Sequence, residues 1–313
     1  MRTPCSIRQV DPCASTRGTL GELSLERHLV GEMTTPPPLY DGLLQLTGHY
    51  DALICDVWGV VHDGVRAYRE SCDALTRFRN EIGPVVLLSN APRVLRDVKM
   101  QFERLGVPEE CYDAIITSGM AARDDLARRA ATGKVALFHL GPERDRGVFE
   151  GLPVALADLQ HASVVLCTGL FNDDVETPDD YRAMLGEMRT RDLSMLCANP
   201  DYLVQRGENL VYCAGALAKA YEQIGGHAIY YGKPYRPIYD LALSAVGPAT
   251  RPLAIGDGLN TDVKGANAAH IDALFIVNGV HAKECEPVTS AHLQSVFERA
   301  GVSVIGSMRT LVW

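Results

Sequence analysis

Long apolar runs are missing from this sequence, and so are paired cysteines and an excess of basic residues. No apolar stretch approaches the roughly 18 residues that a membrane-spanning helix needs. The nine cysteines stand singly, with no C-x-x-C pair and no clustering with histidines, so we expect reduced, buried thiols rather than a metal site or a disulfide framework. A net charge of −9 argues against broad contact with nucleic-acid backbones.

The sequence also lacks internal repeats and the glycine-rich loops G-x-G-x-x-G and G-x-x-x-x-G-K-[ST]. Its first residues show no basic start followed by an apolar core, so we expect no secretory signal, and the single, reduced cysteines predict a cytoplasmic protein. Residues 1–38 contain no strong strand and end in TTPPPL, which predicts a flexible N-terminal extension. We also hypothesise that Met33 is the natural start, in which case mass spectrometry of the native N-terminus would not find residues 1–32.

From Asp51 onward, short β-branched runs alternate with helical patterns, which is typical of a parallel α/β sheet. The predicted strands are ALIC, PVVLLS, DAIITS, KVALFHL, SVVLCTG, SMLCA, LVYC, AIYYG, PLAIGD and ALFIVNG. The predicted helices include residues 94–106, 177–191 and 261–270. Several strands end in small or polar residues, and ligands in open parallel sheets bind beyond the carboxyl ends of the strands. One crevice is therefore expected there.

Two of these strand ends carry carboxylates. Asp56 and Asp257 each follow an apolar strand, and Asp262 lies five residues further on, at the start of the next predicted helix. Carboxylates grouped in this way suit a hard cation such as Mg²⁺, which prefers oxygen ligands. Each residue alone is also a common turn or helix-cap residue. The joint pattern favours a site.

Two further segments supply anion-binding groups. Ser89 and Asn90 follow the run VVLL at a helix entrance, where backbone N–H groups favour an anion. Lys233, in YYGKPYRP, could neutralise a phosphate oxygen. A metal site, an anion pocket, a lysine and a carboxylate that can attack are the parts of phosphoryl transfer through an aspartyl-phosphate.

Four segments of the sequence resemble the motifs of a known family. The segments DVWGVVHDG, LLSNAPR, YYGKPYRPIYDLAL and GDGLNTDVKGANAAHIDALFIVNGV resemble, in order, the four motifs of the haloacid dehalogenase (HAD) superfamily. They are most similar to its class IIA, the NagD-like and p-nitrophenylphosphatase-like proteins, from about Tyr40 to the C-terminus. The long gap between the second and third segments implies an α/β cap at 118–227, inserted into a Rossmann-like core at 39–117 and 228–313.

The resemblance implies roles for the core residues. Asp56 would be the nucleophile and a Mg²⁺ ligand, together with the backbone carbonyl of Trp58. Asp257 would bind Mg²⁺ directly. Asp262 would bind it through water, or would orient Lys233.

The resemblance also implies a phosphoryl pocket and a cap contact. Ser89 and Lys233 would hold the phosphoryl group, with Asn90 beside them. The cap segment CANPDYLV is similar to the class IIA asparagine–proline–aspartate segment, which would place Asn199 and Asp201 near the crevice, facing the leaving group. A plain turn after a strand is an equally good interpretation of that segment.

The sequence departs from the family pattern at Trp58. Phosphatases of this superfamily read Asp-x-Asp there, and the second aspartate moves the proton to the leaving group, whereas an indole has only an N–H donor. Losing such help typically lowers a rate by about 10²–10⁴. His62, Asp63, Asp201 or the substrate itself could supply the proton, although His62-Asp63-Gly64 is more typical of a hairpin tip.

We therefore predict a Mg²⁺-dependent phosphatase acting on a small phosphate ester, for example a sugar phosphate, with activity lowered by Trp58. One alternative is a weak or inactive protein that binds a phosphorylated metabolite. A minor alternative is a metal-independent dehalogenase-like hydrolase, since dehalogenases carry an aromatic residue at the position of Trp58. The expected partner is a small metabolite, with no nucleic acid and no membrane, and the resemblance adds a homodimer through the cap.

Overall fold

The computed structural model describes residues 36–206, 209–247 and 251–313 of the chain. Most of the predicted flexible extension, with Met33, lies outside the described residues. Its last residues, 36–38, are hydrogen-bonded to the folded part of the chain, because the Pro38 carbonyl accepts a hydrogen bond from the Ser307 N–H at 2.9 Å. The Tyr40 N–H donates in turn to the Ser307 carbonyl at 2.8 Å. The predicted extension is therefore too long at this end.

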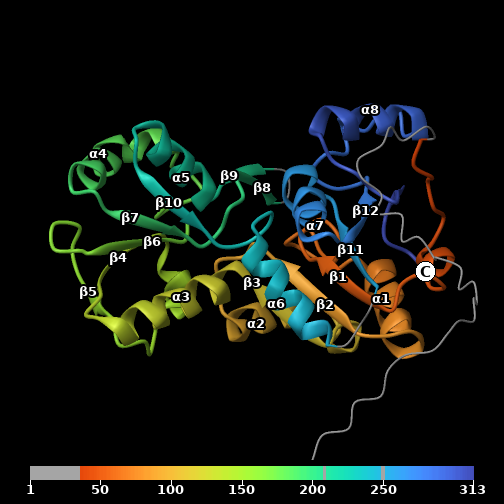
Figure 1. The fold of residues 1–313 in the computed structure, drawn as a ribbon, viewed down its shortest axis with the longest axis horizontal. Coiled ribbons are helices and arrows are strands. Elements are labelled where there is room, and N and C mark those ends of the chain that lie inside the picture. The colour runs from red at the N-terminus through yellow and green to blue at the C-terminus, as the bar shows by residue number, and fades with distance from the viewer. Residues whose placement is uncertain (1–35, 207–208, 248–250) are drawn as a thin grey trace, which may run out of the picture. The chain divides into compact units, whose positions relative to one another are not determined.

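The larger of the two parallel sheets has six strands (Figure 1). Its strands, in spatial order, are β13 (Gly306–Met308), β12 (Asp272–Ile276), β11 (Pro252–Gly256), β1 (Ala52–Asp56), β2 (Val85–Ser89) and β3 (Ala114–Thr117). Strand order reverses at β1, because β2 and β3 continue to one side of it and β11 to β13 to the other. Such a switch point opens a crevice at the carboxyl ends of the central strands.

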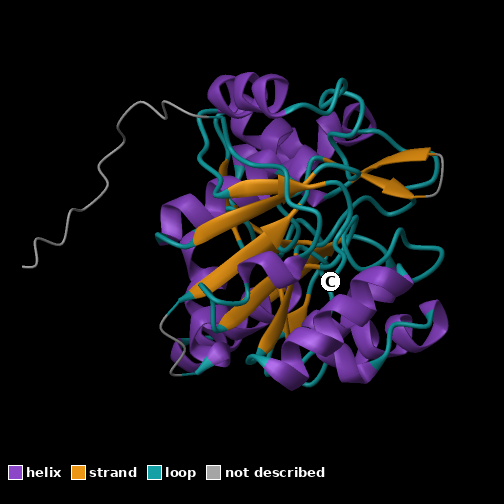
Figure 2. Cartoon of the chain, turned by 90° about the vertical axis from the view of Figure 1, so that its right-hand side faces the viewer, coloured by secondary structure: helices purple, strands orange, loops and turns teal. Residues whose placement is uncertain are grey.

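Helices cover both faces of this sheet (Figure 2). They are α1 (Arg69–Glu81), α2 (Leu95–Leu105), α6 (Arg236–Val246), α7 (Lys264–Ala269) and α8 (Ser290–Ala300). Helices pack on both faces because β1 is apolar throughout and neighbouring side chains of a strand point to opposite faces. Leu53 and Cys55 join a buried cluster with α1 and α2, whereas Ala52 and Ile54 join one with α6, α7 and α8.

A second parallel sheet of five strands lies between β3 and α6 in the sequence. Its strands, in spatial order, are β10 (His227–Tyr230), β7 (Ser194–Cys197), β6 (Val164–Cys167), β4 (Ala136–Leu140) and β5 (Ala155–Leu156). The helices of this region are α3 (Ser118–Thr132), α4 (Arg182–Thr190) and α5 (Ala214–Gln223). An antiparallel hairpin, β8 (Leu203–Arg206) and β9 (Asn209–Tyr212), joins β7 to α5.

The α/β fold with a core sheet and an inserted α/β region is confirmed. The domain boundaries at 117/118 and 227/228 stay a prediction, and β10 continues the second sheet beyond the latter. All ten predicted strands are present, but LVYC belongs to the antiparallel hairpin rather than to a parallel sheet.

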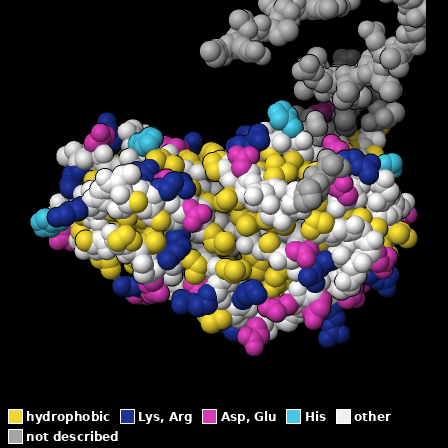
Figure 3. All heavy atoms as spheres, turned by 60° about the horizontal axis from the view of Figure 1, so that its bottom comes forward, with side chains coloured by type: hydrophobic (Ala, Val, Ile, Leu, Met, Phe, Trp, Pro, Cys, Tyr) yellow, Lys and Arg dark blue, Asp and Glu magenta, His cyan; other side chains and the backbone are white. Residues whose placement is uncertain are grey.

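The surface mixes charges of both signs. On the face shown in Figure 3, acidic and basic side chains are interspersed around hydrophobic side chains that gather along the middle. In the described part of the chain, no helix is long and apolar enough to cross a membrane. The seven cysteines within the described ranges are all buried.

Candidate active site

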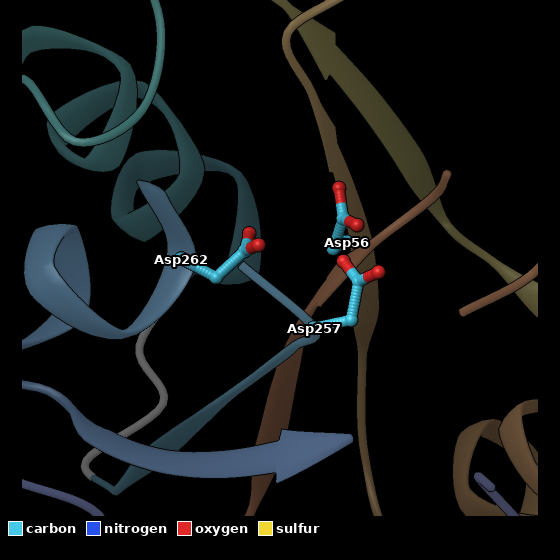
Figure 4. A group of neighbouring side chains, drawn as sticks. All are labelled: Asp56, Asp257 and Asp262. Carbon is cyan, nitrogen blue, oxygen red and sulfur yellow. The ribbon is translucent and has the colours of Figure 1, made fainter. Parts of the chain in front are cut away.

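Three carboxylates meet at the carboxyl ends of β1 and β11. Asp56 is the last residue of β1, Asp257 follows β11, and Asp262 lies in a π-helical turn, Leu259–Val263. Each offers an oxygen within 4.8 Å of the others, and each side chain points toward the same space (Figure 4). All three residues are only 6% exposed. The sequence prediction that these carboxylates lie together therefore holds for the geometry.

Close backbone approach shapes this cluster. A Cβ atom at Gly59, where φ is +84°, would lie 2.3 Å from the Asp257 carboxylate, and one at Gly279 would lie 2.0 Å from it. The Val280 N–H donates to Asp257 Oδ2 at 2.7 Å. Any larger residue at these glycines would displace the Asp257 side chain.

Lys233 is the buried cation of the site. Its Nζ donates to Asp262 Oδ1 at 2.7 Å and also to Asp56 Oδ1, and the residue is 3% exposed. Burial lowers the pKa of a lysine, but the Asp262 and Asp56 carboxylates outweigh it and raise the pKa of Lys233 well above its ordinary value. Lys233 is therefore charged at neutral pH.

One lysine does not neutralise three carboxylates. Burial and the Asp262 carboxylate raise the pKa of Asp56 despite the lysine, and the same two causes raise the pKa of Asp257 to about 7. A cluster of oxygen donors with two excess negative charges fits a divalent cation, which would hold all three carboxylates ionised. The donor set thus fits Mg²⁺ by its chemistry.

Asn90 connects the lysine to the second sheet. Its Oδ1 accepts the Lys233 N–H at 2.7 Å, and its Nδ2 donates to the Lys233 carbonyl at 3.2 Å and to Asp201 Oδ1 at 2.8 Å. Ser89 is buried beside it, where its Oγ accepts the Ala91 N–H at 3.2 Å. The amide of Asn90 therefore fixes the backbone that carries the cation.

The cap segment reaches the site and also forms a turn. Asn199 Oδ1 accepts the Asp201 N–H at 3.1 Å, which is the local turn expected from the sequence. The contact of Asp201 with Asn90 then brings this turn to the carboxyl end of β2. Burial raises the pKa of Asp201. The segment is therefore a turn that lies near the crevice, and its role toward a leaving group stays a prediction.

Trp58 packs into the loop that follows β1. A Cβ at Gly64 would lie 2.6 Å from the Trp58 ring, and the His62 ring meets the indole edge-on with 5.0 Å between centroids. His62 Nδ1 accepts the Gly64 N–H at 3.1 Å, and burial lowers the pKa of His62 to about 4. His62 is therefore neutral at pH 7 and a poor proton donor.

Asp63 forms the turn that the sequence favours. Its Oδ1 accepts the N–H groups of Val65 and Arg66, each at 2.8 Å. Burial would raise the pKa of Asp63, but these N–H groups and the Arg66 charge outweigh it and lower the pKa. An ionised turn carboxylate cannot donate a proton to a leaving group at neutral pH.

A cavity of about 970 Å³ contains these groups. Its lining includes all the predicted site residues: Asp56, Trp58, Ser89, Asn90, Asn199, Asp201, Lys233, Asp257 and Asp262. The sequence prediction missed four arginines that line the same cavity, Arg93, Arg104, Arg144 and Arg206. Only Arg93 carried a signal, because it closes the segment LLSNAPR.

The parallel sheet with a buried aspartate at its switch point, an ion-paired lysine and two more aspartates defines a class of hydrolase. The sequence profile of haloacid dehalogenase-like hydrolases matches residues 53–155, and a second HAD-like hydrolase profile matches residues 230–298. A solved haloacid dehalogenase-like hydrolase from Brucella suis 1330 is 43% identical, with 88% of this chain and 100% of that chain covered and a TM-score of 0.78. The chain belongs to the haloacid dehalogenase-like hydrolase family.

Two curated relatives refine the class. The ribonucleotide monophosphatase NagD of Escherichia coli K12 is 28% identical over 239 residues, which cover 73% of this chain and 88% of the relative. The D-glycerol 3-phosphate phosphatase of Mycobacterium tuberculosis H37Rv is 26% identical over 247 residues, covering 74% of this chain and 64% of the relative. Within its family the chain is NagD-like, as the motif resemblance predicted.

Proposed function

We propose that this chain is a phosphoric monoester hydrolase that cleaves a small phosphate ester, such as a sugar phosphate, with Mg²⁺ and through an aspartyl-phosphate on Asp56. The observation that carries the proposal is the buried Asp56, Asp257 and Asp262 cluster with Lys233 between two of its members. The phosphatase activity of both curated relatives supports the same reaction class.

The chain's own groups account for the two steps. An oxygen of Asp56 forms a bond to phosphorus while the ester P–O bond breaks, and the leaving oxygen takes up a proton. Water then attacks the phosphorus, the bond to Asp56 breaks, and inorganic phosphate leaves. Lys233 and Ser89 hold the phosphoryl oxygens during both steps, with Asn90 beside them.

The metal would be held by Asp56, Asp257 and the Trp58 carbonyl, while Asp262 would bind it through water or would orient Lys233. When bound, it would neutralise charge that develops on the phosphoryl oxygens. The proton for the leaving group has no dedicated donor at Trp58, so esters with good leaving groups are expected to react fastest. Asn199 and Asp201 would face the leaving group.

The primary test is a steady-state assay with p-nitrophenyl phosphate and Mg²⁺. Asp56→Asn keeps the shape of the side chain but removes the nucleophile, and kcat is expected to fall by about 10³-fold or more. Asp240→Asn is the matched control, because Asp240 is an exposed residue of α6 paired with Arg236. Unchanged turnover in Asp56→Asn would refute the mechanism, and halide release from a haloacid without metal would point to the dehalogenase alternative.

A thermal-shift titration with Mg²⁺ tests the metal site without relying on activity. The Tm of the parent is expected to rise with Mg²⁺ concentration, because a ligand of the folded state stabilises it by mass action. Asp257→Asn should abolish most of that rise. An equal rise in parent and variant would place the cation elsewhere.

The chain would act in the cytoplasm on a small phosphorylated metabolite and form a homodimer through its inserted region. A parent that binds p-nitrophenyl phosphate without turnover, and gains turnover in Trp58→Asp, would favour the metabolite-binding alternative.

A further inference from the structure

The charges that line the cavity are unevenly distributed. The end at β1 and β11 has Asp56, Asp257 and Asp262 around Lys233, and Asp201 lies close by. A second set of charges in the lining consists of Arg93, Arg144 and Arg206 with two aspartates, Asp145 and Asp173, to which they are ion-paired. This set, which we name the arginine wall, has more cations than anions among these five residues.

Two arginines of this wall converge on one carboxylate. Arg206, at the end of β8, donates to Asp173 Oδ2 at 2.7 Å and to Oδ1 at 3.3 Å, and Arg144 donates to Asp173 Oδ2 as well. Asp173 is 11% exposed at its side chain, whereas the side chains of Arg144 and Arg206 are 44% and 39% exposed. The shared anion lies beneath two guanidinium groups that remain open.

The charge balance of this trio leaves one positive charge. Asp174 also accepts a hydrogen bond from Arg206, at 3.1 Å, but its side chain is 74% exposed, so water and salt screen its charge. A purely structural ion pair needs one arginine for Asp173. The second guanidinium, drawn from a different segment, gives the wall donors beyond those that Asp173 can accept.

The third arginine, Arg93, adds positive charge to the arginine wall. Arg93 follows the Ser89–Asn90 turn and pairs with the buried Asp145 at 3.4 Å. Burial raises the pKa of Asp145 to about 6 although Arg93 and Arg144 oppose it. Its carboxylate therefore compensates the arginines less completely as the pH falls toward 6.

We infer that the substrate bears a second anionic group, a carboxylate or a second phosphate, which Arg206 and Arg144 bind while the phosphoryl group to be cleaved lies at Asp56. This inference rests on the proposed phosphatase function and names its substrate class. Guanidinium groups match both anions through paired N–H donors. A cavity of about 970 Å³ has room for a small metabolite that spans both sets of charges.

Matched substrates test the inference. 3-Phosphoglycerate differs from glycerol 3-phosphate by a carboxylate in place of a hydroxymethyl group, and fructose 1,6-bisphosphate differs from fructose 6-phosphate by a second phosphate. We expect the parent to prefer at least one anionic member over its partner by about 10-fold or more in kcat/KM. Which pair shows the preference distinguishes carboxylate from phosphate.

Substitutions on the wall then locate the preference. Arg206→Gln is expected to lower the selectivity ratio by about 10- to 100-fold, mainly through a higher KM for the anionic member. Arg206→Lys, which keeps the charge but not the paired donors, should lie between. Arg144→Gln is a second variant, and Arg182→Gln is the matched control, because Arg182 is a 77% exposed residue of α4.

The outcomes separate the two proposals. Equal kcat/KM within both substrate pairs, or an unchanged ratio in folded Arg206→Gln and Arg144→Gln, would overturn the inference while leaving the phosphatase intact. If the parent hydrolyses no phosphate ester, the proposed function fails instead. Calorimetric binding of 3-phosphoglycerate and glycerol 3-phosphate to Asp56→Asn, with and without Arg206→Gln, then still decides the preference for a second anion.

Discussion

The two sets of charged side chains that line the cavity differ in how far they are exposed to solvent. At the strand ends, Lys233 and its carboxylates are almost completely buried, and each charge is held by a partner at hydrogen-bond distance. On the arginine wall, Arg144 and Arg206 are about two-fifths exposed, over a nearly buried Asp173. Buried charges depend strongly on their partners, whereas exposed ion pairs contribute little to stability and keep donors for a ligand.

The largest expected effect is at Lys233. Lys233→Met leaves Asp56 and Asp262 buried without their cation, so we expect kcat/KM to fall by about 10³-fold or more. The free energy of unfolding, measured in urea without divalent cations, should fall by about 3–5 kcal/mol. Arg206→Gln should change it by less than about 1 kcal/mol. Equal destabilisation by the two variants would break the comparison.

The next effect concerns the proton for the leaving group at the buried end. Trp58→Asp restores a carboxylate that can donate a proton, and kcat/KM for glycerol 3-phosphate is expected to rise by about 10²-fold. The rise for p-nitrophenyl phosphate should be much smaller, because that leaving group needs little protonation. Trp58→Phe is the control, since it keeps an aromatic ring against Gly64. A similar gain in Trp58→Phe would mean that ring size, not acid catalysis, limits the rate.

Asn90 joins the buried end to the inserted region. Asn90→Asp sets a carboxylate against Asp201 and the Lys233 carbonyl, both of which now accept hydrogen bonds from Asn90 Nδ2. We expect about a 10-fold loss in kcat/KM and a destabilisation of about 2 kcal/mol. The double variant with Asp201→Asn should recover much of the stability. No recovery would show that the two side chains act independently.

The smallest effect is a pH dependence on the arginine wall. Burial raises the pKa of Asp145 to about 6 from an ordinary value of 3.8, so the folded state binds the proton more tightly than the unfolded state. Its contribution to stability is therefore present below pH 3.8 and is lost as the pH rises through about 6. Asp145→Asn should lessen the fall in unfolding free energy between pH 4 and 7 by about 2 kcal/mol, read from urea melts. A parallel pH profile in parent and variant would contradict this assignment.

Much of the fold could be predicted because strand runs are local patterns. The ten predicted strands are present, and the helix expected at 94–106 is α2. Strands β5, β8 and β13 were missed, and β5 and β13, with two and three residues, are too short to show a period. The predicted strand LVYC pairs with β8, and no local pattern distinguishes a hairpin strand from a parallel one here.

By itself, the sequence determined which polar residues follow an apolar strand at the start of a loop. Asp56, Asp257, Ser89 and Lys233 were recognisable because each follows an apolar run and the four lie in a characteristic chain order. Only the tertiary structure decided which groups meet. Arg144 and Arg206 both donate hydrogen bonds to Asp173, and the Asn90 amide accepts one from the Lys233 N–H. These contacts join segments that are far apart in the chain. Such contacts depend on how packed layers dock, and that information is not contained in local hydrophobic periodicity.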